Sequence, residues 1–313
     1  MIKVGISQCL LGANVRYDGG NKNNRYCKDE LSKHFKFVSL CPEVGIGLPI
    51  PRETIRLVGD IDNPRAVESK DSSIEYTEQL AGFADSNYET ISQMSGYVVC
   101  QASPSCGMER VKVFNDKGQP EKKGVGVFTA RLRKLFPNLP IEENGRLNDP
   151  LLRDSFIKRV FIYNEWQQLA KQGLTVDKLL KFHSRHKMVL LAHSQNLYRQ
   201  LGPIVAQTTK LNIDGQSELY IHLMMKALQK ASTRSNNTNV LMHMQGHLKD
   251  HLDRDDRAEL TECIKEYNEG LQPIMSPITL LKHHFKNNPS QFIARQSYLD
   301  PYPKSMSIRV AMQ

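Results

Sequence analysis

The stretch Gly96–Gly107, with the sequence GYVVCQASPSCG, gives the strongest indication of the fold of the first half of this chain. Residues 97–100 form an apolar, β-branched run, which predicts a short buried strand. Ser103, Pro104 and Ser105 end the strand, and Cys106 follows on a loop next to Gly107. Because α/β sheets bind their ligands at the carboxyl ends of the strands, the stretch predicts a thiol at the functional edge of a sheet.

Two further cysteines follow apolar runs in the same way. Residues 2–7 lead to Cys9, and residues 37–40 lead to Cys41. We expect strands at 2–7, 36–40 and 97–101 that form a small, mostly parallel sheet with crossover helices, among them 28–35 and 76–95. A further helix is expected over 124–136, and residues 49–64 are expected to be a loop. The pattern of strand, cysteine and turn therefore occurs three times within the first 107 residues.

Spacing alone leaves the role of these three thiols open. They could hold a zinc ion with a free fourth position, or three corners of an iron–sulfur cube whose fourth iron stays open. They could also be small buried apolar side chains, because free cysteine is among the most buried residue types. The chain has six cysteines and no C-x-x-C pair. Cys27, Cys100 and Cys263 are expected not to be ligands, with Cys100 inside the strand as a core residue.

Two polar residues lie close to the candidate ligands. Glu43 follows Cys41 by two positions, and Ser103 precedes Cys106 by three. A carboxylate beside a metal site can move protons, and a hydroxyl can orient or relay them. The alternative is that Glu43 is solvated and that Ser103 caps a turn.

The second half of the chain differs from the first in pattern and charge. Asp149-Pro150 predicts a helix start, and helical periodicity replaces the strand signal beyond it, with helices expected over 179–201, 218–230, 239–252, 256–267 and 278–286. We expect an α/β domain over 1–170 and a basic all-α domain over 178–313. Residues 169–313 contain 19 basic and 12 acidic residues, against 23 and 21 in residues 1–168. This excess favours a polyanionic partner that binds mainly to the second half.

The composition also bears on the compartment. Met1-Ile2-Lys3 leads directly into a strand without the apolar core of a signal peptide. No run approaches the roughly 20 apolar residues that span a bilayer. We expect a soluble, cytoplasmic protein with no membrane partner and no obligatory protein partner. In that compartment structural disulfides are not expected.

The chain resembles the thiouracil desulfidase family over residues 1–165. The resemblance rests on four motifs in order: CLLG at 9–12, RYDG at 16–19, LCPE at 40–43 and SPSCG at 103–107. The second half is similar to the helical domain that is fused to this module in bacterial tRNA 4-thiouridine desulfidases. That similarity rests on the segments 182–187, 192–194, 239–246, 280–283 and 298–303.

The resemblance implies a cofactor and a reaction. A 4Fe–4S cluster would be held by Cys9, Cys41 and Cys106, and its open iron would bind the sulfur of a thiolated base. Water activated by Glu43, with help from Ser103, would replace that sulfur without net electron transfer and leave ordinary uridine. Arg16 and Asp18 of the RYDG motif would contact the substrate.

The basic half gives a reason to prefer thiolated tRNA as the substrate. The target base is tucked inside folded tRNA, so that an enzyme must grip the RNA and expose the base. Arg185 and Lys187 lie in a donor-rich segment and could contact phosphates. Two alternatives stay open: a desulfidase of free thiouracil or thiouridine nucleotides, and an iron–sulfur sensor that binds nucleic acid.

Overall fold

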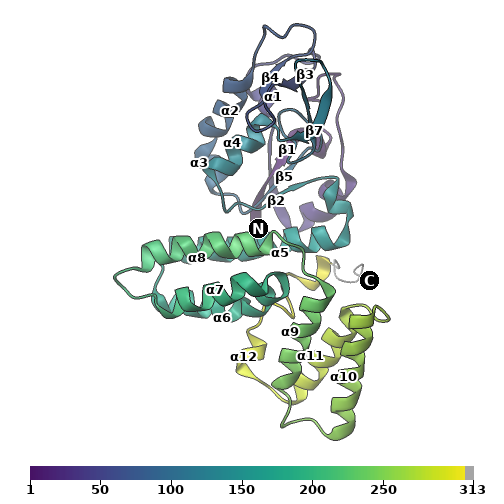
Figure 1. The fold of residues 1–313 in the computed structure, drawn as a ribbon, viewed down its shortest axis with the longest axis vertical. Coiled ribbons are helices and arrows are strands. Elements are labelled where there is room, and N and C mark those ends of the chain that lie inside the picture. The colour runs from purple at the N-terminus through teal and green to yellow at the C-terminus, as the bar shows by residue number, and fades with distance from the viewer. Residues whose placement is uncertain (307–313) are drawn as a thin grey trace. The chain divides into compact units, whose positions relative to one another are not determined.

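A computed structural model describes residues 1–306 and divides the chain into two compact units (Figure 1). The first unit is Met1–Asn148, and the second begins at Asp149. The helix that follows Asp149 belongs to the second unit, whereas we predict from the sequence a first domain that continues to residue 170. The end of the expected second domain, residues 307–313, lies outside the described residues.

A parallel sheet forms the centre of the first unit. Its strands are β1 (Ile2–Ser7), β2 (Phe35–Leu40), β5 (Tyr97–Val99) and β8 (Ile141–Glu143), in the order β2-β1-β5-β8. All three pairings are parallel, with Ser7 opposite Leu40 and Gly5 opposite Tyr97. Every residue of β5 is buried, as an apolar strand in the middle of a covered parallel sheet should be. The predicted sheet is confirmed, and β8 is an addition to it.

Helices α2 (Thr77–Ser86), α3 (Tyr88–Ser92) and α4 (Val127–Leu135) lie along one side of the sheet in Figure 1. Phe128 of α4 packs between the rings of Tyr97 and Phe83, at centroid distances of 5.8 and 5.9 Å. The single helix expected over 76–95 is interrupted at Asn87, whose side-chain amide donates to the carbonyl of Phe83. The remaining short elements of this unit are turns of the 3-10 type at Gln8–Leu11, Leu31–Lys33 and Arg146–Asn148, one π-helical turn at Tyr26–Glu30, and α1 (Pro42–Gly45).

A second, mixed sheet was not predicted. It contains β3 (Ile55–Val58), β4 (Arg65–Glu68), β6 (Val111–Phe114) and β7 (Pro120–Gly124), in the order β4-β3-β6-β7. The pairs β3–β4 and β6–β7 are antiparallel, and β3–β6 is parallel. The prediction of a loop over residues 49–64 is wrong at Ile55–Val58, which form β3. Strands of four residues carry little periodicity, and β7 has the polar, exposed sequence PEKKG, so the pattern gave no signal.

The second unit is helical from its first residues, which confirms the expected change of class. Asp149 caps the first helix by accepting from the backbone amides of Leu151 and Leu152 at 2.8 and 3.2 Å. The helices are α5 (Pro150–Lys171), α6 (Val176–His193), α7 (Gln195–Ala206), α8 (Ile213–Leu228), α9 (Arg234–Gly246), α10 (Arg254–Glu269), α11 (Met275–Asn287) and α12 (Gln291–Ala294), followed by a 3-10 turn at Lys304–Met306.

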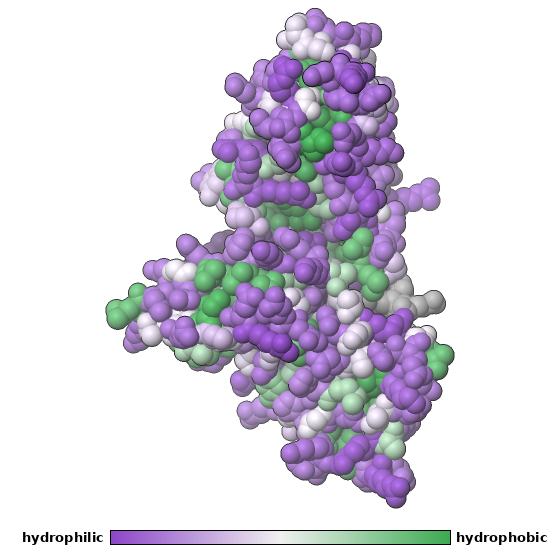
Figure 2. All heavy atoms as spheres, in the orientation of Figure 1, coloured by the Kyte–Doolittle hydropathy of each residue, from purple (hydrophilic) through white to green (hydrophobic). Residues whose placement is uncertain are grey.

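The expected helix over 179–201 is in fact two helices. Ser194 ends α6 and caps α7, since its hydroxyl accepts from the amide of Leu197 at 3.3 Å. The core of this unit contains an aromatic group, in which the ring of Trp166 lies 5.3 Å from Phe182 and 5.8 Å from Tyr220. Hydrophilic residues cover most of the visible face in Figure 2, with apolar residues in smaller groups. Within residues 1–306, no helix is both long and apolar enough to cross a membrane.

Candidate functional site

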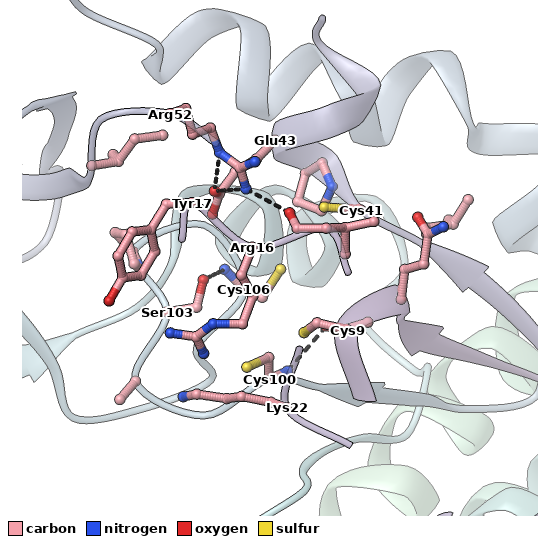
Figure 3. Close-up of a pocket in the computed structure, with 18 of the residues that line it drawn as sticks. Cys9, Arg16, Tyr17, Lys22, Cys41, Glu43, Arg52, Cys100, Ser103 and Cys106 are labelled. Atoms are coloured by element: carbon pink, nitrogen blue, oxygen red, sulfur yellow. Dashed lines mark hydrogen bonds and ion pairs between the residues drawn. The ribbon is translucent and has the colours of Figure 1, made fainter. Parts of the chain in front are cut away.

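A cavity of about 170 Å³ opens at the carboxyl ends of β1, β2 and β5 (Figure 3). Because neighbouring parallel strands end at the same edge of a sheet, loops that are far apart in the sequence meet there. Four cysteines line the cavity: Cys9, Cys41, Cys100 and Cys106. The structure therefore brings together the three thiols that the sequence singled out, and adds a fourth.

Each predicted ligand is positioned by the strand end that precedes it. Cys9 lies in the 3-10 turn after β1, and its carbonyl accepts from the amides of Gly12 and Lys22 at 3.3 and 3.0 Å. Cys41 occupies the position before α1, where Pro42 starts the helix. Cys106 lies on the loop after β5, and its carbonyl accepts from the hydroxyl of Thr129 at 2.6 Å. These contacts hold the backbone of each cysteine at the cavity.

The turn that carries Cys106 is closed by Ser103. The Ser103 hydroxyl accepts from the amides of Ser105 and Cys106, at 3.2 and 3.1 Å. Gly107 donates to the Ser103 carbonyl at 2.8 Å, and a Cβ at Gly107 would lie 2.4 Å from Val111 and 2.9 Å from that carbonyl. Close packing therefore requires a glycine at position 107. Ser103 caps this turn, which was one of the two roles considered for it from the sequence. Ser103 also lines the cavity.

The protonation of the thiols follows from their burial. Burial raises the pKa of the Cys41 and Cys106 thiols. The thiols of Cys9 and Cys100 share a hydrogen bond, which raises the pKa of Cys9 and lowers that of Cys100, a shift that the charges of Lys22 and Arg16 reinforce. Because thiolates are the metal-binding form, the predicted ligands are sites whose protons a soft metal cation would displace.

The donor set fits an iron–sulfur cluster by its chemistry. Thiolate sulfur is the ligand of iron–sulfur clusters, and a cube distributes its thiolates over separate irons. Among residues 1–306, no three His, Cys, Asp or Glu side chains converge as they would on a single metal ion. The thiols of Cys9, Cys41 and Cys106 instead stand around one cavity that has room between them.

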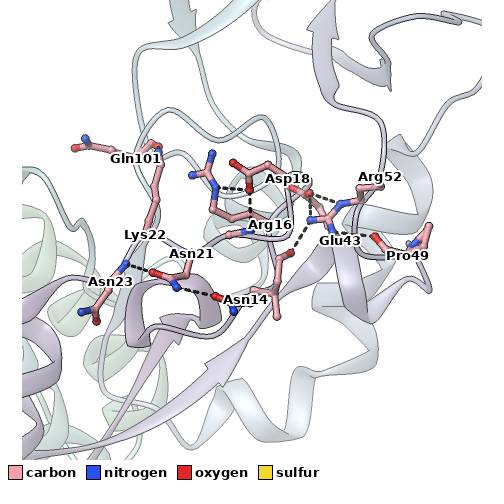
Figure 4. Close-up of polar contacts among 12 residues, drawn as sticks. Asn14, Arg16, Asp18, Asn21, Lys22, Asn23, Glu43, Pro49, Arg52 and Gln101 are labelled. Carbon is pink, nitrogen blue, oxygen red and sulfur yellow. Dashed lines mark hydrogen bonds and ion pairs between the residues drawn. The ribbon is translucent and has the colours of Figure 1, made fainter.

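Glu43 lies in the same cavity with both carboxylate oxygens engaged (Figures 3 and 4). One oxygen accepts from Nε and Nη2 of Arg52 at 3.0 and 2.5 Å, and the other accepts from the Ser105 hydroxyl at 2.8 Å. The Arg52 side chain is 5% exposed and also donates to the carbonyls of Val15 and Pro49. Such a network holds the Glu43 carboxylate in one orientation in the cavity that the cysteines line. Glu43 is therefore not simply solvated.

The other predicted contact residues are divided between the two units. Arg16 lines the cavity. Asp18 is not among its described lining residues; its carboxylate accepts from the Gly20 amide at 3.0 Å and lies 3.5 Å from Arg16. In the second unit, Arg185 contacts the Glu165 carboxylate at 3.2 Å and the carbonyl of Arg295 at 3.3 Å, and Lys187 lies 4.3 Å from the centre of the Phe292 ring.

Sequence reasoning missed four members of the site: Lys22, Arg52, Cys100 and Ser105. Cys100 was predicted to be a core residue inside the strand. It is buried, with 5% of its surface exposed, but it lies just after β5, which ends at Val99, and it lines the cavity. Its place directly after the apolar run, like that of Cys41, was an available signal. Ser105 lay inside the quoted motif, while Lys22 and Arg52 lie in loops that carry no periodic signal. Cys27 lies buried in the turn at Tyr26–Glu30, and Cys263 lies on α10.

Comparison with known proteins agrees with this division of the chain. Residues 4–144 match the family described as 2-thiouracil desulfurase, and residues 187–303 match the family of proteins of unknown function DUF1722. The uncharacterized protein YbgA of Escherichia coli strain K12 is 36% identical over 157 residues, which is 50% of this chain and 93% of YbgA. A solved structure described as the 4Fe–4S-dependent thiouracil desulfidase TudS is 25% identical and covers 48% of this chain and 95% of its own, with a TM-score of 0.39. The predicted resemblance is confirmed at the level of family.

Proposed function

Because the chain belongs to the 2-thiouracil desulfurase family through its first half, we propose that it is a desulfidase that converts 4-thiouridine in tRNA to uridine. One observation carries the proposal: three thiols from three strand ends and the carboxylate of Glu43 line the same cavity. A site for carbon–sulfur hydrolysis needs a soft acceptor for sulfur and a base for water, and this cavity offers residues for both.

The cofactor in this proposal is a 4Fe–4S cluster held by Cys9, Cys41 and Cys106. When bound, such a cluster supplies a soft Lewis acid with an open position for the sulfur of the substrate. The donor chemistry supports this assignment, since the three ligands are thiols and lie at separate points of the cavity wall. Cys100 then serves as a neighbour of Cys9, and once Cys9 is a thiolate the hydrogen bond between the two sulfurs would have the Cys100 thiol as its donor.

Glu43 is the proposed base. Arg52 holds one of its oxygens, and the other accepts only a neutral hydroxyl bond from Ser105. That second oxygen can exchange its partner for a water molecule and take up a proton as the water attacks the ring carbon. The Ser103 hydroxyl stands on the cavity wall and can orient the water or the base, while it closes the turn under Cys106.

The helical half supports tRNA as the substrate. Residues 169–313, with 19 basic and 12 acidic residues, account for +7 of the formal net charge of +9 that the chain carries. A basic surface of this kind binds phosphates without regard to sequence and provides the grip that is needed to expose a folded base. A desulfidase of free bases needs no such surface.

The test is mass spectrometry of nucleosides from thiolated tRNA that has been incubated with anaerobically cluster-loaded protein. The proposal expects 4-thiouridine to disappear and an equal amount of sulfide to appear, and Glu43→Gln serves as the inactive control. Turnover of 4-thiouracil or 4-thiouridine monophosphate with no change in tRNA would assign the enzyme to free substrates instead. No turnover of any of them by cluster-loaded protein would refute a desulfidase.

A further inference from the structure

The mixed sheet of the first unit separates its charged residues between its two faces (Figure 1). Side chains alternate between the faces along each strand, so the register of the four strands decides which residues share a face. The inner face packs in the hydrophobic core through Leu57, Ala66, Val111 and Val113. By the same register, the basic residues of the outer face are Arg56, Arg65, Lys112 and Lys122.

The acidic residues of these strands lie on the inner face. Glu68 is the register partner of Ile55 on β3, and Glu121 is the register partner of the buried Val113 on β6. Within the strands of this sheet, the outer face therefore carries cations without carboxylates between them.

The centre of the outer face places like charges side by side. Lys112 lies directly opposite Lys122 in the antiparallel pair of β6 and β7. Arg56 is the neighbour of Lys112 in the parallel pair of β3 and β6, where the next residues along, Leu57 and Val113, are register partners. Neighbouring strands are about 4.8 Å apart, so these three cations, called here the outer-face row, span about 10 Å.

Such an arrangement works against the stability of the sheet. Like charges directly opposite each other on neighbouring strands are destabilising. Within residues 1–306, no carboxylate pairs with any member of the outer-face row, whereas Arg65 at the margin of the same face pairs with Glu75 at 3.2 Å. Places where a sequence breaks a local rule of stability are typically functional sites. The row therefore calls for an anion from outside the chain.

The members of the row are available to such an anion. Lys112 and Lys122 are exposed. The Arg56 guanidinium lies 5.7 Å from the centre of the Phe114 ring and donates to the Ser72 hydroxyl at 2.9 Å. A hydroxyl and a ring leave the positive charge of Arg56 unneutralised while they fix its position on the face.

The row begins next to the cavity of the candidate site. Thr54 and Ile55, the two residues before Arg56 in the chain, line that cavity. A base that enters the cavity as part of an RNA is flanked by phosphates, so its strand has to cross the surface beside the entrance. Cations at that place bind the backbone and position the strand without regard to sequence.

We propose that the outer-face row, Arg56, Lys112 and Lys122, binds the phosphate backbone of the thiolated tRNA next to the base that enters the cavity. A row of cations matches a polyanion that repeats its charge, whereas one small anion would leave part of the row without a partner. This inference rests on the proposed desulfidase function and gives the first unit an RNA-binding surface of its own.

The experiment compares four full-length, cluster-loaded proteins. They are the wild type, the charge-reversal variant Lys122→Glu, the double variant Lys112→Gln, Lys122→Gln, and a control double variant Lys36→Gln, Lys134→Gln. The control removes two exposed cations of the same unit that lie outside this sheet, on β2 and α4.

Fluorescence anisotropy of labelled, thiolated tRNA over a salt series measures binding. Both row variants are expected to lose about tenfold in affinity at low salt, and the control is expected to match the wild type. In the Lys112, Lys122 double variant the slope of log Kd against log salt should fall by about 1.5, because two phosphate contacts release their counterions no longer. Unchanged affinity and slope in both row variants, or an equal loss in the control, would overturn the proposal.

Urea unfolding separates RNA binding from folding. Lys122→Glu places a carboxylate opposite Lys112, so its urea midpoint should equal or exceed that of the wild type although its affinity for tRNA falls. A lower midpoint that accompanies weaker binding would assign the lysines to the stability of the sheet and overturn the proposal.

Sulfide release tests the link to the cavity. The row variants should show a KM for thiolated tRNA that is about tenfold higher at unchanged kcat, and no such change with 4-thiouridine 5′-monophosphate, which is too small to reach the row from the cavity. Equal losses on both substrates would contradict a backbone contact outside the cavity. If the wild type turned over none of the thiolated substrates, the desulfidase function would fail, and the anisotropy comparison would still decide whether the row binds RNA.

Discussion

Arg52 donates two hydrogen bonds to a single carboxylate oxygen of Glu43, from Nε at 3.0 Å and from Nη2 at 2.5 Å. The pair is well shielded, with side-chain exposures of 5% for Arg52 and 17% for Glu43. The guanidinium also donates to the carbonyl of Val15, so the same side chain connects the carboxylate to the loop that carries Arg16 and Tyr17. Arg52 is thereby a positioning residue for both sides of the cavity.

Replacement of Glu43 by Gln tests the proposed base. The amide keeps the shape of the side chain but cannot accept a proton, so we expect the cluster to be retained and turnover to fall at least about 100-fold. Visible absorbance and iron content check the first expectation, and sulfide release checks the second. Glu121→Gln, on the exposed strand β7, is the matched control. A variant that loses its colour would make Glu43 a ligand or a folding residue instead.

Replacement of Arg52 by Met removes the partner of a shielded carboxylate. Loss of one member of a buried ion pair leaves the other charge without compensation, and we expect a loss in the free energy of unfolding of about 3 kcal/mol. Arg52→Lys keeps the charge but not the forked geometry, and should recover part of the stability while activity stays low. Urea unfolding of the three proteins measures the first effect. Full activity in the Lys variant would remove the positioning role.

The cysteine set separates ligands from neighbours. We expect Ala at Cys9, Cys41 or Cys106 to abolish the brown colour and bound iron of the reconstituted protein, because a cube held by three thiolates loses one of its anchors. Cys263→Ala, on α10, should leave both unchanged. Cys100→Ala should retain the colour, since this thiol is assigned as the hydrogen-bond neighbour of Cys9. A colourless Cys100 variant would show that a fourth thiolate fills the open position.

The buried side chain of His193 is expected to make the stability of the second unit depend on pH. It is buried on α6 with Nδ1 2.5 Å from the carbonyl of Lys230, and burial lowers its pKa to about 3 from an ordinary value of 6.5. Between those values the unfolded chain binds a proton that the folded chain does not, so stability is present above pH 6.5 and is lost as the pH falls.

The measurement is the urea midpoint of wild type and His193→Asn at pH 7 and at pH 5, with exposed His251→Asn as the control. The wild type and the control should lose more stability between the two pH values than His193→Asn, because the amide does not titrate. Equal losses in all three would assign the acid sensitivity to other groups.

Arg185 and Lys187 test the role of the helical half. The double variant Arg185→Gln, Lys187→Gln should weaken tRNA binding about tenfold at low salt, and the dependence of log Kd on log salt should become less steep, because fewer counterions are released. Fluorescence anisotropy over a salt series measures both. Lys210→Gln, an exposed cation before α8, is the control. An unchanged salt slope in the double variant would place the RNA surface elsewhere in the chain.

Much of the architecture could be predicted because it depends on local patterns. The apolar runs at 2–7 and 97–99 mark buried strands, and Asp149-Pro150 marks the helix start that opens the second unit. The second sheet could not be predicted in this way, since β3 and β4 are only four residues long and are stabilised by pairing across the sheet. The break at Ser194 was missed because the apolar stripe continues across it.

The sequence by itself determined the parallel sheet and the helical second half. It also indicated that Cys9, Cys41, Cys106 and Glu43 lie at strand ends, because a residue that follows an apolar run lies at the end of a strand whichever strands pair. Only the tertiary structure decided that Arg52 and Ser105 hold Glu43, that Cys100 stands beside Cys9, and that Arg16 and Lys22 share a cavity. These relationships join loops that are tens of residues apart in the sequence. Strand order and register bring those loops together, and no local pattern records either of them.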